Sequence, residues 1–231
     1  MNAPLADVPS ADPVLVFSHL RWGEHWQRPQ QLLVRLARGR QVLYVEPPRF
    51  LDDLARPRIE QSLVYPGVHR LVTKLPVSYR QQERVTEVTV RTLLVDLLGP
   101  FGAFAERLAA PILWFFTPMP APIMIGAFDE RLIVYDPTSA TAAHAIDPAT
   151  FREREALLLR HANLVFADRD PGAVSASDAS AHRSTEAWDA LVDDIDRLLR
   201  DVCANRRPTS ATDHPAAMPG WAAALVTRRG G

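Results

Sequence analysis

The apolar residues of this chain gather in short unbroken runs that alternate with amphipathic stretches. Such runs are typical of strands buried on both faces of a parallel sheet. They predict strands over Val14–Phe17, Val42–Val45, Val68–Thr73, Ile112–Phe116, Leu132–Tyr135 and Asn163–Ala167. Helices are predicted from Pro29 to Gly39, over Gln81–Leu98, over Phe101–Leu108 and over Pro148–His161. The alternation across residues 14–167 predicts an α/β fold with a Rossmann-like, doubly wound and mostly parallel sheet.

The first unit of this pattern, Val14–Pro48, has the order strand, loop, helix and strand. Pro29 belongs in the first helical turn, where its missing N–H is not needed, and Gly39 ends the helix. The segment Glu46–Pro48 is expected to end the second strand. From there to Pro66 the chain is expected to be irregular, because proline interrupts regular structure.

The chain changes character after residue 167. Residues 168–184 are small, polar and turn-forming, which is typical of a linker. Over residues 185–204 apolar side chains recur at helical spacing, so we expect an added amphipathic helix docked on the domain. On this basis Trp188→Ala should destabilise the domain by about 3 kcal/mol. The leader, residues 1–13, is expected to be loose, and the tail, residues 205–231, to be disordered.

Composition and charge narrow the class of protein. The chain has 231 residues, enough for one good core, and its net charge of −1 gives no global field that attracts nucleic acid. Lys74 is the only lysine among 26 basic residues, so we interpret the many arginines first as compositional bias. Cys203 stands alone and the first residues lack a signal-peptide pattern. Together these features favour the reducing cytoplasm.

One segment, Pro111–Phe128, is uncharged and is therefore a candidate membrane span. Its four prolines interrupt a helix, and its length lies at the lower limit for a span. A buried strand followed by a loop is the favoured interpretation. The alternative is peripheral membrane contact through Met119–Phe128.

The loop after the first strand, Ser18–Arg28, is rich in groups that recognise polar ligands. In open parallel sheets, ligands bind outside the carboxyl ends of the strands, where this loop begins. The His19 imidazole can hydrogen-bond a hydroxyl group or share its proton, which makes His19 the candidate catalytic residue. Ser18, Arg21 and Trp22 are candidate substrate-binding residues, because a guanidinium grips anions and an indole stacks on a sugar ring. In the alternative interpretation, Trp22 covers the sheet edge and the backbone satisfies His19.

Three charged residues complete the candidate substrate-binding set. Arg28 precedes the first helix and can meet a phosphate beside the helix amides, or it can pair with Glu24 or Glu46. Glu46 has the place of the ribose-binding acid in dinucleotide folds, but the loop lacks a GxGxxG pattern, which argues against NAD. Asp136 follows the strand at Leu132–Tyr135, where it faces the site or forms a turn.

The sequence predicts neither a cofactor nor a metal site. His144 and His161 have no metal-ligand spacing with other histidines, cysteines or acids. The charged run Arg152–Glu155 is interpreted as a solvated helix face.

Six segments of the chain occur in a characteristic order: FSHLRW, QRPQQLLVRLA, VLYVEPP, ILWFFTP, LIVYD and REREALLLRHANLVFA. Together they resemble the N-terminal half of bacterial GT-B glycosyltransferases, most closely the family-1-like group sometimes joined to UDP-galactopyranose mutase. The resemblance covers residues 13–167. It implies two Rossmann-like domains, of which the first mainly binds the acceptor and the second mainly binds the nucleotide-sugar donor. Transfer of a hexosyl unit then takes place in the cleft between them.

The sequence departs from this family in two places. Relatives continue after the sixth strand into a complete donor domain, whereas here residues 168–184 lead to a helix that resembles the family's terminal segment. The resemblance thus predicts an acceptor domain whose donor domain is missing. Relatives also carry an acidic YDxxDE-type segment after the fifth strand, where this chain reads Pro137–Ala140.

Three functions remain open at this point, and the sequence leaves undecided whether the chain alone is an enzyme. The first is a glycosyltransferase-like protein that uses a nucleotide sugar and an unknown acceptor, alone, as a homodimer or with a partner chain. The second is a non-catalytic remnant or acceptor-binding module. The third, a flavodoxin-like or nucleotide-binding module, rests on the fold alone.

Overall fold

The computed structural model describes residues 11–23, 26–99, 102, 108–137, 147–166 and 185–205, with side chains in the last range from Trp188 onward. Its strands are β1 (Ala11–Phe17), β2 (Arg40–Leu51), β3 (Arg58–Tyr65), β4 (Val68–Pro76), β5 (Ile112–Phe115), β6 (Leu132–Tyr135) and β7 (Leu164–Val165). Its helices are α1 (Arg28–Leu36), the 3-10 helix η1 (Val77–Gln81), α2 (Glu83–Leu98), α3 (Ala121–Met124), α5 (Pro148–His161) and α6 (Thr185–Asn205).

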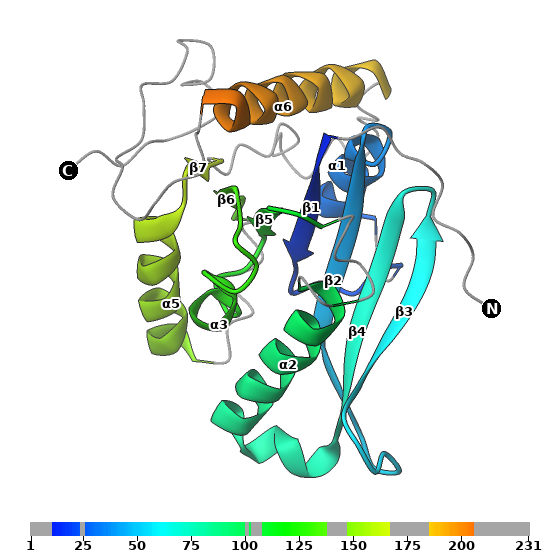
Figure 1. Ribbon diagram of the computed structural model, residues 1–231, viewed down its shortest axis with the longest axis vertical. Helices are drawn as coiled ribbons and strands as arrows, with labels where there is room; N and C mark the ends of the chain where they lie inside the picture. The colour runs from blue at the N-terminus through cyan, green and yellow to red at the C-terminus, as the bar shows by residue number, and fades with distance from the viewer. Residues whose placement is uncertain are drawn as a thin grey trace, which may run out of the picture.

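The described strands form one seven-stranded sheet in the order β3-β4-β2-β1-β5-β6-β7. Neighbouring strands are parallel except β3 and β4, which form an antiparallel hairpin at one edge. In Figure 1, β1 lies in the middle, with β2 on one side and β5 on the other. The chain therefore first builds outward from β1 in one direction and then in the other, which makes the β1–β5 boundary a topological switch point.

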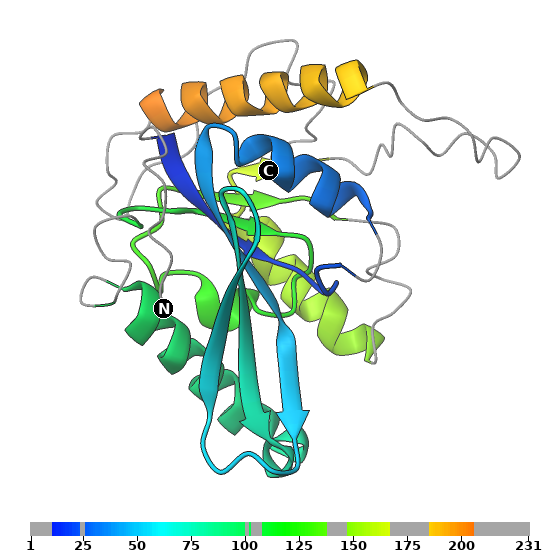
Figure 2. The ribbon, with the colours of Figure 1, turned by 90° about the vertical axis from the view of Figure 1, so that its right-hand side faces the viewer.

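Helices pack on both faces of this sheet (Figures 1 and 2). Side chains alternate along β1, so Val14 and Val16 join a core that includes α1 and α6, whereas Leu15 and Phe17 join a core that includes α2, α3 and α5. Figure 2 shows α1 and α6 lying together beside the sheet. The predicted Rossmann-like, doubly wound and mostly parallel fold with an added helix is confirmed.

The edge hairpin is the main feature that the sequence pattern missed. β3 occupies residues predicted to be irregular, and β2 continues through Pro47 and Pro48 to Leu51. The pairing of β2 with β4 shifts register between Glu46 and Arg49, so the two prolines fall in an irregularity of the ladder. Prolines are tolerated at such a place because no regular ladder hydrogen bond is required from them.

Helix α6 docks through a continuous apolar stripe. The side chains of Ile195, Leu198 and Leu199 are fully buried against α1 and the sheet. Trp188 lies nearer the edge, partly exposed, where the Arg35 guanidinium stacks over its ring at 5.8 Å. The expected loss of about 3 kcal/mol on truncation therefore applies to the buried leucines rather than to Trp188.

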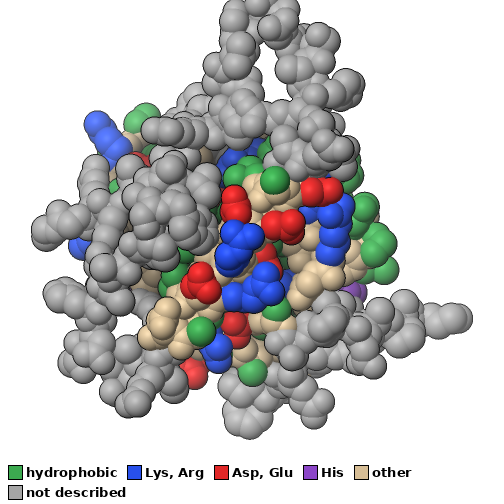
Figure 3. All heavy atoms as spheres, turned by 90° about the horizontal axis from the view of Figure 1, so that it is seen from above, with side chains coloured by type: hydrophobic (Ala, Val, Ile, Leu, Met, Phe, Trp, Pro, Cys, Tyr) green, Lys and Arg blue, Asp and Glu red, His purple; other side chains and the backbone are tan. Residues whose placement is uncertain are grey.

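Ion pairs hold the polar side of this contact. Arg35 Nε donates to Asp189 Oδ1 at 2.9 Å, and the buried Arg40 donates through Nε to Asp196 Oδ1 at 2.5 Å. Seen from the α6 end of the molecule, acidic and basic side chains intermingle on the outer surface (Figure 3). The outward side of α6 thus has the mixed charge typical of a solvent-facing helix.

The uncharged segment Pro111–Phe128 contains β5, as predicted. After β5 it forms the short helix α3, where only a loop was predicted. Within the described residues, no helix is long and apolar enough to cross a membrane. The helix predicted over Phe101–Leu108 falls almost entirely outside the described residues, as do the predicted linker and tail. Of the leader predicted to be loose, residues 11–13 instead form the start of β1.

Candidate functional site at the carboxyl ends of the strands

A cavity of about 690 Å³ opens where the parallel strands end. Ser18 and His19 follow β1, Glu46 on β2 directly follows Val45, the last β2 residue paired with β1, and Thr117 lies just beyond β5. Ser18, Glu46 and Thr117 are buried, so polar groups close one end of the cavity. The cavity thus lies at the switch point, where α/β proteins of this topology bind ligands.

Apolar side chains from the α2 side of the sheet form most of the remaining cavity wall. They come from β1, the β2 extension, α2, α3 and α5, and include Phe17, Phe50, Val90, Leu94, Met124 and Phe151. The surface that a ligand would meet is therefore mainly hydrocarbon away from the strand ends.

A single arginine ties together the helices around this cavity. Arg154 on α5 donates to Glu83 Oε1 and pairs with Glu87 Oε1 on α2, both at 2.6 Å, and donates to the Met119 carbonyl at 2.7 Å. Its side chain is only 14% exposed. The expectation that the Arg152–Glu155 run is a solvated helix face is therefore wrong for Arg154.

The same run contributes a second inward contact. Glu155 accepts a hydrogen bond of 2.7 Å from the Tyr135 hydroxyl at the end of β6. Burial and this carboxylate raise the pKa of Tyr135 well above its ordinary value, so the phenol stays protonated. Tyr135 therefore serves as a hydrogen-bond donor that links β6 to α5.

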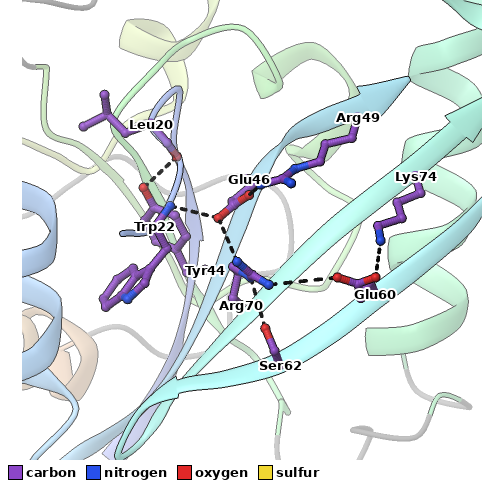
Figure 4. Close-up of polar contacts among 9 residues, drawn as sticks. All are labelled: Leu20, Trp22, Tyr44, Glu46, Arg49, Glu60, Ser62, Arg70 and Lys74. Atoms are coloured by element: carbon purple, nitrogen blue, oxygen red, sulfur yellow. Dashed lines mark hydrogen bonds and ion pairs between the residues drawn. The ribbon is translucent and has the colours of Figure 1, made fainter. Parts of the chain in front are cut away.

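Glu46 lies at the centre of a polar network on the β2-β4-β3 part of the sheet (Figure 4). Its carboxylate accepts the Trp22 backbone N–H at 2.8 Å and Arg49 Nη2 at 3.4 Å, and it pairs with Arg70 Nη1 at 3.9 Å. Arg70 also bonds Ser62 on β3. Because the protein itself supplies these donors, the carboxylate holds the β1 loop against β2.

Trp22, predicted to bind substrate, packs within an aromatic row and is absent from the cavity wall. Its ring lies edge-on to Tyr44 at 5.0 Å and to Trp26 at 6.4 Å, and Trp26 in turn meets Tyr65 at 6.5 Å. The Tyr44 hydroxyl donates to the Leu20 carbonyl at 2.9 Å. This packing matches the alternative in which Trp22 covers the sheet, while stacking on a sugar stays a prediction.

Arg28 and Asp136 are brought together although 108 residues separate them. Arg28 Nη2 lies 3.3 Å from Asp136 Oδ1, and Asp136 is almost completely buried. The sequence predicted that Arg28 either meets a phosphate or pairs with Glu24 or Glu46. In the structure Arg28 does pair with an acid, but that acid is Asp136. Arg21 is half-buried and does not line the cavity.

Of the seven predicted site residues, the cavity wall gathers Ser18, His19 and Glu46. Thr117 and Arg154 were missed. The rule that singled out Ser18, a polar residue directly after a buried strand, also applies to Thr117 after Ile112–Phe116. Arg154 carried no such signal, because its inward direction depends on how α5 packs.

The cavity rim also contains the N-cap of α5. Asp147 accepts from the backbone N–H groups of Ala149 and Thr150, at 3.0 and 3.3 Å. Its hydrogen bond from the Thr150 hydroxyl, followed by these backbone bonds, lowers the pKa of Asp147. Among the described residues, no group of three or more histidines, cysteines and acids is arranged to hold a metal ion.

No protein-family model matches the sequence, and no curated protein matches it significantly. Among solved structures, the fold is similar to the trehalose-6-phosphate structure from E. coli bound with UDP-2-fluoro glucose, at a TM-score of 0.40 and 12% identity. The alignment covers 69% of this chain and 41% of that one. The chain therefore spans about two-fifths of this neighbour.

Two bacterial enzymes give weaker similarities. The α,α-trehalose 6-phosphate synthase from Burkholderia multivorans has a TM-score of 0.37 and 13% identity, over 70% of this chain and 41% of that chain. The α,α-trehalose-phosphate synthase (UDP-forming) from Burkholderia vietnamiensis has a TM-score of 0.33 and 10% identity, over 66% and 38%. At these scores the likeness carries no argument about activity.

Proposed function

We propose that this chain is the acceptor-binding domain of a glycosyltransferase, which transfers a hexosyl unit from a nucleotide sugar to a hydroxyl group. The observation that carries this proposal is the cavity of about 690 Å³ at the switch point, with Ser18, His19 and Thr117 at its polar end. The ordered sequence resemblance to the first domain of GT-B glycosyltransferases supports the same class.

In this reaction the acceptor oxygen attacks the anomeric carbon of the donor. The bond between that carbon and the diphosphate breaks, and the nucleoside diphosphate leaves. His19 is the group that orients the acceptor hydroxyl and takes its proton, while Ser18 and Thr117 offer hydroxyl groups to the bound acceptor. Orientation of the two reactants supplies much of the rate enhancement in such transfers.

A second candidate function is an acceptor-binding module without transferase activity. The specific observation in its favour is that the predicted charged ligands already have partners within the chain. Asp136 offsets the charge of Arg28, and Glu46 accepts donors from Trp22 and Arg49. A departing diphosphate needs unoccupied donors or positive charge, which these residues do not provide.

Calorimetric titration and a transfer assay test the proposal on the purified chain with UDP, GDP and their common sugar conjugates. We expect saturable binding of a nucleotide sugar, held by the chain alone or by its homodimer, and hexosyl transfer to a glycoside acceptor, with transfer reduced at least about a hundredfold in His19→Ala. His161→Ala is the matched control, because His161 lies at the exposed end of α5. Binding of glycosides without nucleotide binding or transfer would favour the second function. Absence of both kinds of binding from a folded sample would refute the two functions together.

A further inference from the structure

The cavity wall is far more apolar than recognition of a sugar alone requires. Beyond the polar end at Ser18 and Thr117, the lining changes to Val45, Phe50, Leu94 and Met124. Sugar hydroxyl groups pressed against such a wall would lose their hydrogen bonds to water without replacement, at a cost of about 1–3 kcal/mol each. The apolar part of the cavity thus favours hydrocarbon over further sugar units.

The cavity also has the length for a sizeable apolar group. It follows the extension of β2 from Val45 to Phe50, six residues whose end-to-end distance along the strand is about 16 Å. Its volume of about 690 Å³ falls in the range that encloses most of a drug-sized ligand. Helix α2 closes this length through Val90 and Leu94.

Arg154 and Arg80, the two arginines in the lining, both have contact partners within the chain. Arg154 pairs with Glu83 and Glu87, while the Arg80 guanidinium stacks over the Phe50 ring at 5.4 Å. Both arginines therefore contribute to the wall through their hydrocarbon stems and flat faces. The wall thus remains mainly hydrocarbon away from the polar end at Ser18 and Thr117.

From these observations we infer that the acceptor is amphiphilic, with a hydroxyl-bearing head at Ser18 and His19 and an aliphatic or aromatic group seated along β2 and α2. This inference rests on the proposed glycosyltransferase function for the role of the head group. The tail-binding part depends only on the cavity. Hydrophobic burial of the tail would supply affinity, and the polar end would fix which oxygen reacts.

The test is calorimetric titration of the full chain with alkyl β-glucosides from methyl to octyl, each below its micelle concentration. We expect affinity to rise about fourfold per methylene, the equivalent of about 0.8 kcal/mol for each buried CH₂. A rise of less than about 1.5-fold per methylene would overturn the inference. This slope is measured without a nucleotide sugar, so it is independent of whether transfer occurs.

A matched pair of variants locates the tail. Thr86→Trp fills the cavity from α2, whereas Val85→Trp adds the same side chain on the neighbouring exposed position. We expect Thr86→Trp to weaken octyl glucoside binding at least about tenfold and to leave methyl glucoside unchanged, with no loss in Val85→Trp. Equal effects of the two variants, with both folded by circular dichroism, would place the tail elsewhere and overturn the assignment.

Discussion

Truncation of a buried leucine in α6 tests whether this helix is an integral part of the core. Leu198 is completely buried among side chains of α1 and the sheet. Leu198→Ala removes three carbon atoms, a transfer loss of about 2.4 kcal/mol at 0.8 per group, and leaves a cavity that close-packed neighbours only partly fill. We expect a loss of about 3 to 4 kcal/mol in the free energy of unfolding.

Two further variants calibrate that value. Trp188→Ala removes a partly exposed ring and its contact with Arg35, so we expect a loss of only about 1 to 2 kcal/mol. Asp193→Ala, on the exposed side of the same helix, should change stability by less than about 0.5 kcal/mol.

Urea denaturation followed by tryptophan fluorescence measures all three variants. Trp114 is fully buried in the core that α6 covers and stacks on Phe166 at 5.4 Å, so its emission reports this region. An equal or smaller loss in Leu198→Ala than in Trp188→Ala would refute the docking argument. A smaller change of the free energy of unfolding with urea concentration, together with a separate transition at low urea, would show that α6 unfolds independently of the sheet.

Three other properties follow from particular contacts. Burial raises the pKa of the Cys203 thiol from 9.0 to about 11. Alkylation of Cys203 at pH 8 should therefore be roughly a hundredfold slower than in the unfolded chain, and it should accelerate as the pH rises toward 11. Equal alkylation rates in the folded and unfolded states would contradict the burial. Asp136→Ala leaves Arg28 without its carboxylate partner and should lower the free energy of unfolding, measured by chemical denaturation, by about 2 to 3 kcal/mol. Part of this loss should be recovered in the double variant with Arg28→Met. No recovery would mean that Asp136 acts through other contacts. Gly67 has φ of +77°, and an added Cβ would lie 2.7 Å from the Ala37 carbonyl oxygen. Gly67→Ala should therefore lower the melting temperature and reduce the free energy of unfolding by about 2 kcal/mol. An unchanged melting temperature would show that the hairpin turn relaxes freely.

The sequence was informative about the fold wherever strands are buried on both faces. Val14–Phe17 and Ile112–Phe115 are unbroken apolar runs because each has a helix layer on either side. The sequence did not predict β3, because β3 is an edge strand with many exposed positions. An irregularity in its pairing between Leu63 and Tyr65 also disturbs its alternation. No local rule distinguishes such a strand from a loop.

The candidate site shows the same division between local and long-range information. Position at a strand end selected Ser18 and His19, which line the cavity, but it also selected Asp136, which does not. Glu46, singled out as the counterpart of a ribose-binding acid, lines the cavity as well. The pairing of Arg28 with Asp136 depends on how two distant segments meet, which no spacing rule reveals. Likewise, the hydrogen bond from the Trp22 backbone to Glu46 and the packing of the Trp22 ring on Tyr44 join residues of the β1 loop and of β2 that lie far apart in the sequence.

The ion pairs of α6 join segments more than 150 residues apart, since Arg35 meets Asp189 and Arg40 meets Asp196. During synthesis, the core that α6 shares with α1 and the sheet therefore stays incomplete until residues near 200 have left the ribosome. Chains halted before that point would lack Ile195, Leu198 and Leu199 and so leave the hydrophobic core on this face of the sheet open. Such nascent chains should engage chaperones, and the final packing step should follow release of the helix rather than completion of the sheet.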